Sequence, residues 1–358
     1  MTTAAAAAAA LLVGLGWAGQ AHAMDTTFMG WADFAVQMDD STDGNANFDQ
    51  GHLYLVADAH VNQSWSVFSV VEFEHLPSTS EQETVGSILL ERAYIEYGKN
   101  AGRLRFGRVI TPFGIRVPTH WVMLTPMLSK PPVESMGHIQ NHSVGIEGHA
   151  QVVAGDMELE FTGLIHNGIE TSGTDVAKDG LTGMVADVRA TWASVYTVGT
   201  SIAHTGIPNH DGLGHHAAVG FADFTLPANL LLRAESVLFD PFEQDRHWAH
   251  YALATYTLHP YEQLTAGYRI AFGVTGVDMV DTTPTHTANL SWVPTSSVRV
   301  LLEYENAADI SMNLDHASMD HASMDHASMD HASMDHASMD DDTVEQVQSL
   351  TLWLGTSF

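Results

Sequence analysis

The 358-residue chain contains no cysteine, which excludes thiolate metal sites, disulfide frameworks and covalent c-type haem. Lysine and arginine are scarce: 13 stand against 43 aspartates and glutamates, for a formal net charge of −30. Nucleic-acid binding needs basic surfaces, so we expect no nucleic-acid partner. The composition favours cations or neutral solutes as partners.

Long apolar runs and enzyme motifs are also missing. After residue 23 no stretch approaches the roughly 20 apolar residues that a membrane-spanning helix needs. No G-x-S-x-G, H-E-x-x-H or P-loop pattern occurs. We therefore expect neither an enzyme nor a required cofactor.

The first 23 residues differ in composition from the rest. An apolar stretch from Ala4 to Val13 leads to the small-residue site Ala21-His22-Ala23. This order predicts a secretory signal peptide over 1–23, cut before Met24. Met1-Thr2-Thr3 carries no basic residue, which leaves open an upstream start, an atypical signal or an ordinary N-terminal helix.

The last segment alternates with period two. Leu350, Leu352, Leu354 and Phe358 share one face, and Ser349 and Thr351 share the other. This alternation predicts a half-apolar strand over 346–358. A final amphipathic strand that ends in Phe resembles the last strand of outer-membrane proteins.

Similar segments recur along the chain. Each is near the roughly 9–11 residues that cross a bilayer as a tilted strand, and their number is even, as in outer-membrane barrels. Short connections follow the even segments and longer polar ones follow the odd segments, which predicts short periplasmic turns and long outer loops. The segments are 24–38, 49–61, 64–75, 88–99, 102–110, 142–152, 155–167, 181–193, 195–205, 215–226, 228–239, 246–258, 262–272, 284–293, 296–306 and 346–358.

The fold class predicted for residues 24–358 is all-β: a transmembrane antiparallel β-barrel of about 16 strands. Charges gather on one strand face; Arg299 and Glu303, for example, oppose Val300 and Leu302. Charge at mid-membrane on the lipid side costs about 2–4 kcal/mol for Arg or Lys, so we assign the charged face to an aqueous lumen. The alternative is a soluble sandwich with its charges toward solvent.

Residues 111–141 form an unusual loop. It carries Trp121, several prolines and an apolar group that includes Met123, Leu124 and Met127. A solvated loop does not need such residues, so we expect the loop to fold into the barrel and constrict the pore. The alternative is a cap over the barrel mouth or a subunit interface.

Basic residues concentrate locally, with seven of the 13 between Arg92 and Lys130. A basic wall that faces carboxylates across the lumen would orient polar solutes at a constriction. The predicted pore-lining residues are Arg92, Glu96, Arg103, Arg105, Arg116, Glu134, Arg189, Arg233, Arg269, Arg299 and Glu303.

Residues 107–114 carry a motif. Gly107, Arg108, Thr111, Pro112, Phe113 and Gly114 match a G-[KR]-x-x-T-P-F-G pattern. The segment resembles outer-membrane porins related to the phosphate-selective group, in which it leads from a strand into a long loop. The resemblance implies a porin and suggests a homotrimer. Phosphate-selective members have Lys- and Arg-rich lumens, so anion selectivity is not carried over to this acidic chain.

A repeat lies in the predicted extracellular loop 307–345. From Asp315 to Asp340 the unit Asp-His-Ala-Ser-Met recurs five times, a period that builds neither a helical stripe nor a strand face. Imidazole and thioether groups suit Cu and Zn, and the unit resembles tracts of outer-membrane copper-resistance proteins. The alternative is replication slippage in a tolerant loop. The candidate metal ligands are His316, Met319, His321, Met324, His326, Met329, His331, Met334, His336 and Met339.

Two more histidine pairs, His138 with His142 and His215 with His216, are possible metal ligands. The function predicted from these patterns is passive diffusion of small hydrophilic solutes, with a cation preference, through a porin in Gram-negative outer-membrane lipid. The alternative is a metal-binding surface protein whose barrel is an anchor or a metal-uptake channel.

Overall fold

The computed structural model describes residues 25–39, 46–74, 87–99, 101–115, 117–119, 125–129, 141–167, 183–206, 214–240, 247–258, 263–275, 284–308 and 346–357. The predicted signal peptide, the repeat, Arg116 and Glu134 lie outside these ranges. No helix within them is long and apolar enough to cross a membrane.

All 16 predicted strands are present, and no end differs by more than three residues from its predicted position. The strands are β1 Asp25–Asp39, β2 Ala46–His60, β3 Trp65–Glu74, β4 Ser87–Lys99, β5 Gly102–Ile110, β6 His142–Ala154, β7 Met157–His166, β8 Gly183–Trp192, β9 Tyr196–Gly206, β10 Gly214–Leu226, β11 Leu230–Asp240, β12 His247–Thr257, β13 Leu264–Thr275, β14 Thr285–Thr295, β15 Val298–Ala308 and β16 Gln346–Ser357. A short 3₁₀ helix, η2, covers Val117–Thr119.

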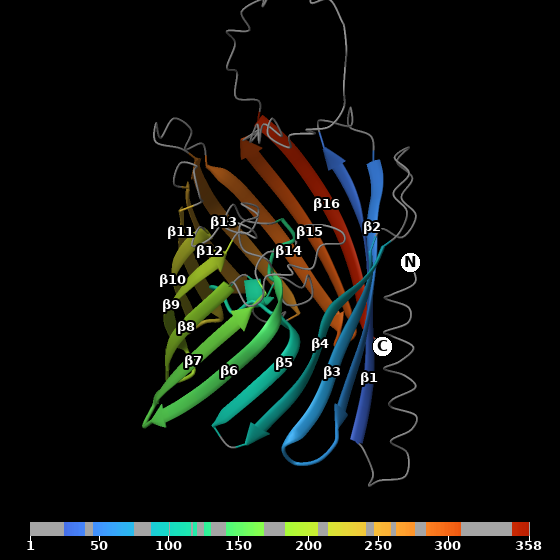
Figure 1. The fold of residues 1–358 in the computed structure, drawn as a ribbon. Helices are drawn as coiled ribbons and strands as arrows, with labels where there is room; N and C mark the ends of the chain where they lie inside the picture. The colour runs from blue at the N-terminus through green and yellow to red at the C-terminus, as the bar shows by residue number, and fades with distance from the viewer. Residues whose placement is uncertain are drawn as a thin grey trace, which may run out of the picture.

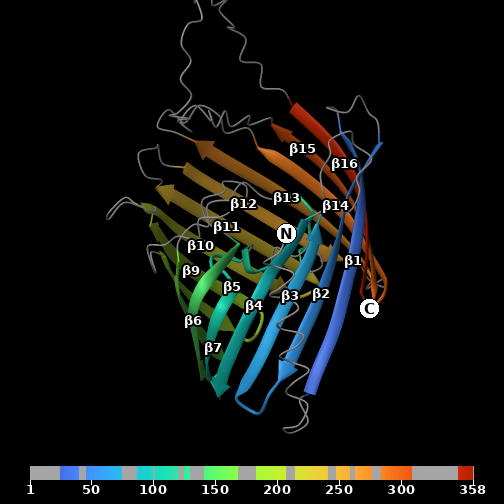
Figure 2. The same cartoon turned by 45° about the vertical axis from the view of Figure 1, so that its right-hand side comes forward.

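The strands form one closed antiparallel barrel (Figure 1). Each pairs with its neighbours in the chain, and β1 closes the ring against β16, with Trp31 opposite Ser357 and Asp39 opposite Ser349 (Figure 2). Closure leaves no exposed strand edge, so every strand finds backbone hydrogen-bond partners on both sides. The predicted barrel is confirmed, and the two-sheet sandwich is excluded.

Connection lengths alternate as predicted. Those after even-numbered strands contain two to six residues, and those after odd-numbered strands contain six to 37. At two short turns, Ala193-Ser194 and Ala228-Asn229, both central residues have positive φ, the geometry that matches the twist of paired strands. All short turns therefore lie at one end of the barrel.

The two barrel faces differ in chemistry. On β16, Leu352 is 48% exposed on the outside, whereas its neighbour Trp353 is 3% exposed and stacks on Trp31 inside. The same alternation places Met184 outward and Asp187 inward on β8, and Leu302 outward and Glu303 inward on β15. The outer face is an apolar band, whereas the inner face carries the charged side chains together with a buried hydrophobic cluster on which part of the loop packs.

Aromatic residues gather on the outer face near the short turns. Trp65 and Tyr97 lie with ring centroids 4.8 Å apart beside one turn, and Trp192 and Tyr196 flank another. Trp292 lies near the turn that precedes β15. Trp and Tyr favour the membrane–water boundary, so this girdle of aromatic side chains marks where the apolar outer band meets water.

Candidate channel lining

The inner wall of β4, β5 and β6 carries a charge triad. Arg105 donates from Nε to Oε2 of Glu96 at 2.7 Å and from an Nη to Oε1 of Glu147 at 2.9 Å. The three residues occupy opposite positions on neighbouring strands, and the Arg105 guanidinium also lies 4.9 Å from the ring centroid of Tyr94. Each charge therefore finds its counterion on the adjacent strand.

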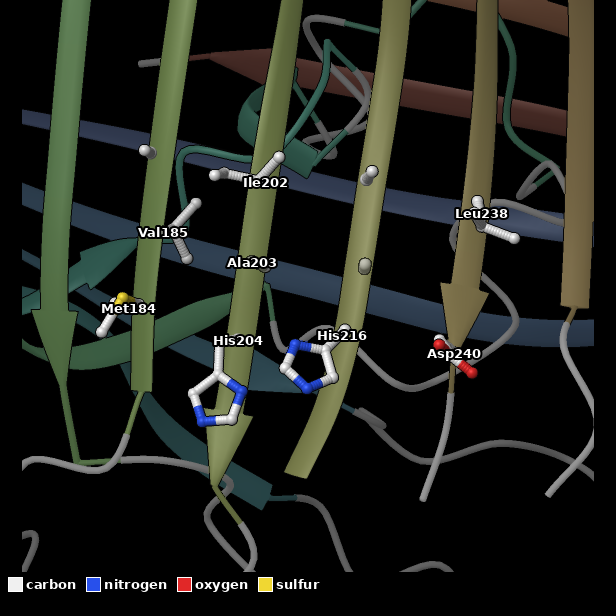
Figure 3. A pocket seen from close by; sticks show the side chains of 11 residues that line it. Met184, Val185, Ile202, Ala203, His204, His216, Leu238 and Asp240 are labelled. Carbon is white, nitrogen blue, oxygen red and sulfur yellow. The ribbon is translucent and has the colours of Figure 1, made fainter. Parts of the chain in front are cut away.

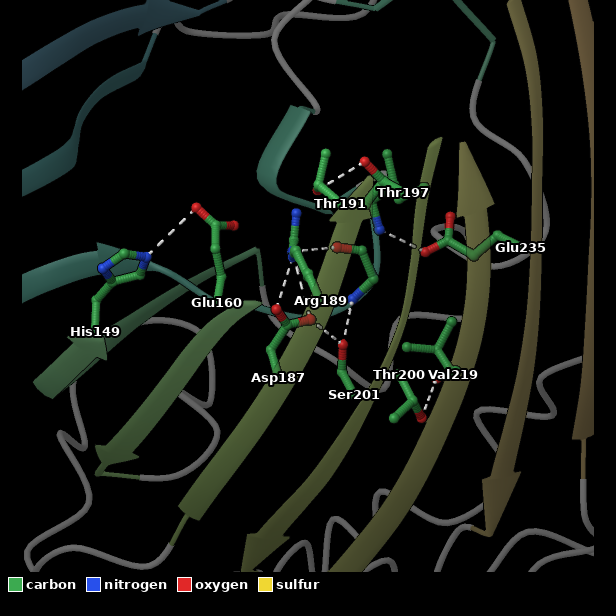
Figure 4. A network of polar contacts seen from close by, with 12 residues as sticks. His149, Glu160, Asp187, Arg189, Thr191, Thr197, Thr200, Ser201, Val219 and Glu235 are labelled. Carbon is green, nitrogen blue, oxygen red and sulfur yellow. Dashed lines mark hydrogen bonds and ion pairs between the residues drawn. The ribbon is translucent and has the colours of Figure 1, made fainter. Parts of the chain in front are cut away.

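The next stretch of wall binds the start of the 111–141 loop (Figure 4). The Gly114 amide donates to Oγ of Ser201 at 3.0 Å, and the Ile115 amide donates to Oε1 of Glu235 at 2.8 Å. Arg189 donates to the Gly114 carbonyl at 2.8 Å and pairs with Asp187 at 2.7 Å. Side chains from β8, β9 and β11 thus satisfy backbone groups that would otherwise be buried without partners.

The backbone geometry explains the glycines of the 107–114 motif, which leads from β5 into the loop. Gly107 (φ 137°) and Gly114 (φ 62°) adopt backbone conformations that L side chains rarely take. A Cβ on Gly107 would overlap the Ala93 backbone, and one on Gly114 would overlap the Glu235 carboxylate. Thr111 shares a hydrogen bond with Ser143 at 3.0 Å, and Phe113, 1% exposed, packs into the hydrophobic core inside the barrel. The motif residues therefore turn the chain from β5 onto the inner wall formed by β8, β9 and β11.

A second loop segment, residues 125–129, lies against β13, β14 and β15. The amides of Leu128 and Ser129 donate to the two carboxylate oxygens of Glu303 at 2.8 and 2.7 Å. Glu303 is 3% exposed, so these bonds replace its hydration.

Two arginines and an amide complete this contact. Arg269 donates to the Ser129 carbonyl at 2.6 Å, and Arg299 donates to the Thr125 carbonyl at 2.9 Å. Asn289 donates to the carbonyl of Pro126. The described parts of the loop are therefore bound to the inner wall at two separate places.

The remaining predicted lining residues have varied surroundings. The guanidinium of Arg92 lies 4.0 Å from Glu91. Arg103 lies opposite His149 in the register, and its Nε has no hydrogen-bond partner among the described residues. Arg233 pairs with Asp223 at 2.6 Å.

Several contact residues were absent from the predicted set, chiefly Asp187, Ser201, Glu235 and Glu147. Each lies on the inward phase of its strand. The alternation of charges assigns Asp187 and Glu235 to the lumen face beside Arg189 and Arg233, so for these two the sequence predicted the face but not the loop contact. Ser201 has no such signal, because a lone serine inside a strand is common. Its role depends on the loop reaching it.

The predicted metal ligands are only partly described. The repeat and His138 lie outside the described residues, and His142 has its Nε2 3.2 Å from a Glu91 oxygen. The residue opposite His204 in the register is His216, whereas His215 lies opposite Thr205. Among the described side chains, no group of three His, Asp or Glu is arranged to hold a metal ion.

Comparisons with known proteins find similarity in structure alone. No family model matches the sequence, and no curated protein matches it.

Solved structures of outer-membrane porins and channels match this chain. OmpF of Salmonella typhi, solved with daunomycin, aligns at a TM-score of 0.61 and 11% identity over 93% of this chain and 97% of that one. An anion-selective porin from Comamonas acidovorans aligns at 0.60 and 11% over 94% and 100%. The outer membrane channel DcaP of Acinetobacter baumannii aligns at 0.59 and 14% over 94% and 98%. At these identities the likeness shows the fold: a 16-strand barrel of the outer-membrane porin type.

Proposed function

We propose that the protein is an outer-membrane diffusion channel for small hydrophilic solutes. The observation that carries the proposal is the closed 16-strand barrel with an apolar outer band and a charged inner wall. Barrels of 16 to 18 strands enclose enough space for an aqueous passage. Porins and channels share this fold, which adds support without deciding the solute.

The 111–141 loop sets the pore diameter in this proposal. Its described segments contact the inner wall from β8 to β15, so they occupy cross-section that water would otherwise fill. The parts of the loop outside the described residues, including Arg116 and Glu134, are proposed to complete the constriction.

A cation preference is the second part of the proposal. It rests on the net charge of −30, which concentrates cations at the barrel mouths. The fold itself does not decide whether cations or anions are preferred, because one porin with this fold is anion-selective. Arginine and carboxylate groups that remain partly exposed on the wall, such as Arg105 and Glu96, would orient the solute.

The proposed setting is the outer membrane of a Gram-negative bacterium, after removal of residues 1–23. The girdle of Trp and Tyr side chains near the short turns and the outward apolar band support contact with lipid. A homotrimer is proposed by analogy with an outer membrane protein of this fold that was solved in a trimer form. No cofactor is part of the proposal.

The direct test is conductance in a planar bilayer under a KCl gradient. Stepwise openings with a reversal potential of the cation-selective sign are expected. A folded barrel that never conducts would overturn the channel proposal, and an anion-selective reversal potential would overturn only the cation preference.

The repeat supports a second candidate, a metal-binding surface protein that uses Cu or Zn. Its supporting observation is five histidines and five methionines at a fixed period between Asp315 and Asp340. Stoichiometric metal binding that is lost on deletion of Asp315 to Asp340, in a barrel that does not conduct, would favour this candidate.

A further inference from the structure

We propose that His204 and His216 form a binding site for a divalent transition-metal ion on the outer face of the barrel, separate from the repeat. His204 lies two residues before the end of β9, and His216 lies two residues after the start of β10. They occupy opposite positions in the register of the two strands. The site therefore lies at the end of the barrel with the long connections, where the apolar band gives way to water.

The two imidazoles lie side by side and tilted. Their ring centroids are 4.7 Å apart with a 34° angle between planes, so nitrogens of both rings can approach one ion (Figure 3). Nδ1 of His204 is buried and has no hydrogen-bond partner among the described residues. A buried ring nitrogen without a donor offers a lone pair for coordination when the imidazole is neutral.

Other histidines on the same outer face behave differently. His250 is bonded through Nδ1 to the Ser236 hydroxyl at 2.8 Å, and His286 is bonded through Nδ1 to the Tyr268 hydroxyl at 2.6 Å. Both find a hydroxyl on the neighbouring strand, which satisfies one ring nitrogen. At His204 the corresponding neighbours are Met184 and His216, and neither offers a hydroxyl.

The strands on either side of the two histidines carry further potential ligands at the same register level. Met184 on β8 lies opposite His204, and Asp240 on β11 lies opposite His216. A thioether and a carboxylate at these register positions are within reach of an ion on the imidazoles after a change of rotamer. Because no group of three His, Asp or Glu is preset among the described residues, the two imidazoles are the primary ligands and water completes the sphere.

The surroundings favour binding. The two histidines, Met184 and Asp240 border a pocket of about 390 Å³ on the outer face. The pocket is lined also by Ile202, Ala218 and Leu238. The apolar lining lowers the local dielectric constant, which strengthens the attraction between an ion and its imidazole ligands. Paired imidazoles suit Cu²⁺, Ni²⁺ and Zn²⁺, and the general order of affinities places Cu²⁺ first.

The test is metal-dependent stability of the full chain refolded in lipid vesicles, followed by urea unfolding with and without CuCl₂ or ZnCl₂. An ion that bridges two strands binds only the folded barrel, so it raises the ratio of folded to unfolded protein roughly 100-fold at a free-metal concentration 100 times its dissociation constant. Binding by a loop repeat that is equally available in both states leaves the urea midpoint unchanged. The measurement therefore separates the two metal sites and does not depend on conductance.

The expected result is a metal-induced rise in midpoint in the unmodified chain that is lost in H204Q and in H216Q. H250Q is the matched control, since it removes an outer-face imidazole that is already bonded, and it should keep the full rise. Each variant is compared with its own metal-free midpoint, and either His variant suffices if the other folds poorly. No rise in the unmodified chain, a rise that survives in the double variant, or a rise lost equally in H250Q would overturn the proposal.

Discussion

The inner walls formed by β4–β6 and by β8–β15 carry similar residues that are used in different ways. On β4–β6, Arg105 pairs with Glu96 and Glu147 of the adjacent strands. On β8–β15, Arg189 and Arg269 donate to loop carbonyls, and Glu303 accepts from loop amides. The first wall neutralises its own charges, whereas the second uses its charges to hold a loop.

This difference teaches that an inward charge is not automatically a selectivity residue. Groups bonded to the loop backbone act through geometry, because they decide where the loop lies. In the proposed channel, groups paired between strands and still partly hydrated would act on the ions that pass. Substitutions on the two walls should therefore change different properties of the proposed channel.

The largest effect is expected at Gly114. An alanine there would take a left-handed conformation, at about 1–2 kcal/mol, and its Cβ would overlap the Glu235 carboxylate. The first loop contact should be lost, and single-channel conductance should rise and become noisy. The matched control is Gly163→Ala on β7, where an added Cβ meets no atom within 4 Å. Unchanged conductance in Gly114→Ala would contradict the holding role of this wall.

A smaller effect on the same wall is expected from Glu303→Gln. The amide keeps one acceptor oxygen, so one of the two bonds to the Leu128 and Ser129 amides is lost, at about 1.5–3 kcal/mol for a charge-assisted bond. Urea unfolding and conductance noise would report the change. Glu160→Gln removes an inward carboxylate that pairs with His149 on the neighbouring strand, and it should leave the noise unaltered.

On the wall of β4–β6, Arg105→Gln should alter selectivity more than conductance. It leaves Glu96 and Glu147 without their counterion, so the reversal potential in a KCl gradient should move further toward cations. Arg105 and Glu96 are 22% and 25% exposed, so their broken pair should cost only about 1 kcal/mol. Glu147 is 5% exposed, so the loss of its counterion should account for most of the lost unfolding free energy. Glu147→Gln should move the reversal potential the opposite way; shifts of equal sign would contradict the assignment.

The smallest effect is expected at Arg233, whose partner is Asp223 on the adjacent strand. The side chains of Arg233 and Asp223 are 13% and 21% exposed and form a single pair, so Arg233→Gln should cost about 1–2 kcal/mol in urea unfolding. Single-channel conductance should stay within the spread of the unmodified protein. A conductance rise like that of Gly114→Ala would mean that this pair also positions the loop.

Strand positions were predictable because a barrel strand repeats one local rule. Outward Leu350 and Leu352 alternate with inward Thr351 and Trp353, and every neighbouring strand imposes the same period. The predicted end of β14 was too early: the strand was predicted to end at residue 293, before Pro294, and runs to Thr295, because a proline without an N–H is tolerated where the register shifts between Trp292 and Thr295.

Partners of the inward charges were less predictable, because they depend on where a loop crosses the lumen. Glu303 was predicted to face a basic wall across the pore, and its carboxylate instead accepts two loop amides. Whether it also contributes to the field across the lumen stays a prediction. His204 and His216 were each visible in the sequence, yet their pairing appears only in the strand register.

Alternating side chains and turn residues in the sequence by themselves determined the barrel, its strand number and which face meets lipid, since these follow from a period of two and from connection length. Only the tertiary structure decided which charges pair with each other, which bind the loop and which histidines meet. Those contacts join residues as far apart as Ile115 and Glu235, and no local pattern specifies a contact between segments that the chain brings together only when the barrel closes.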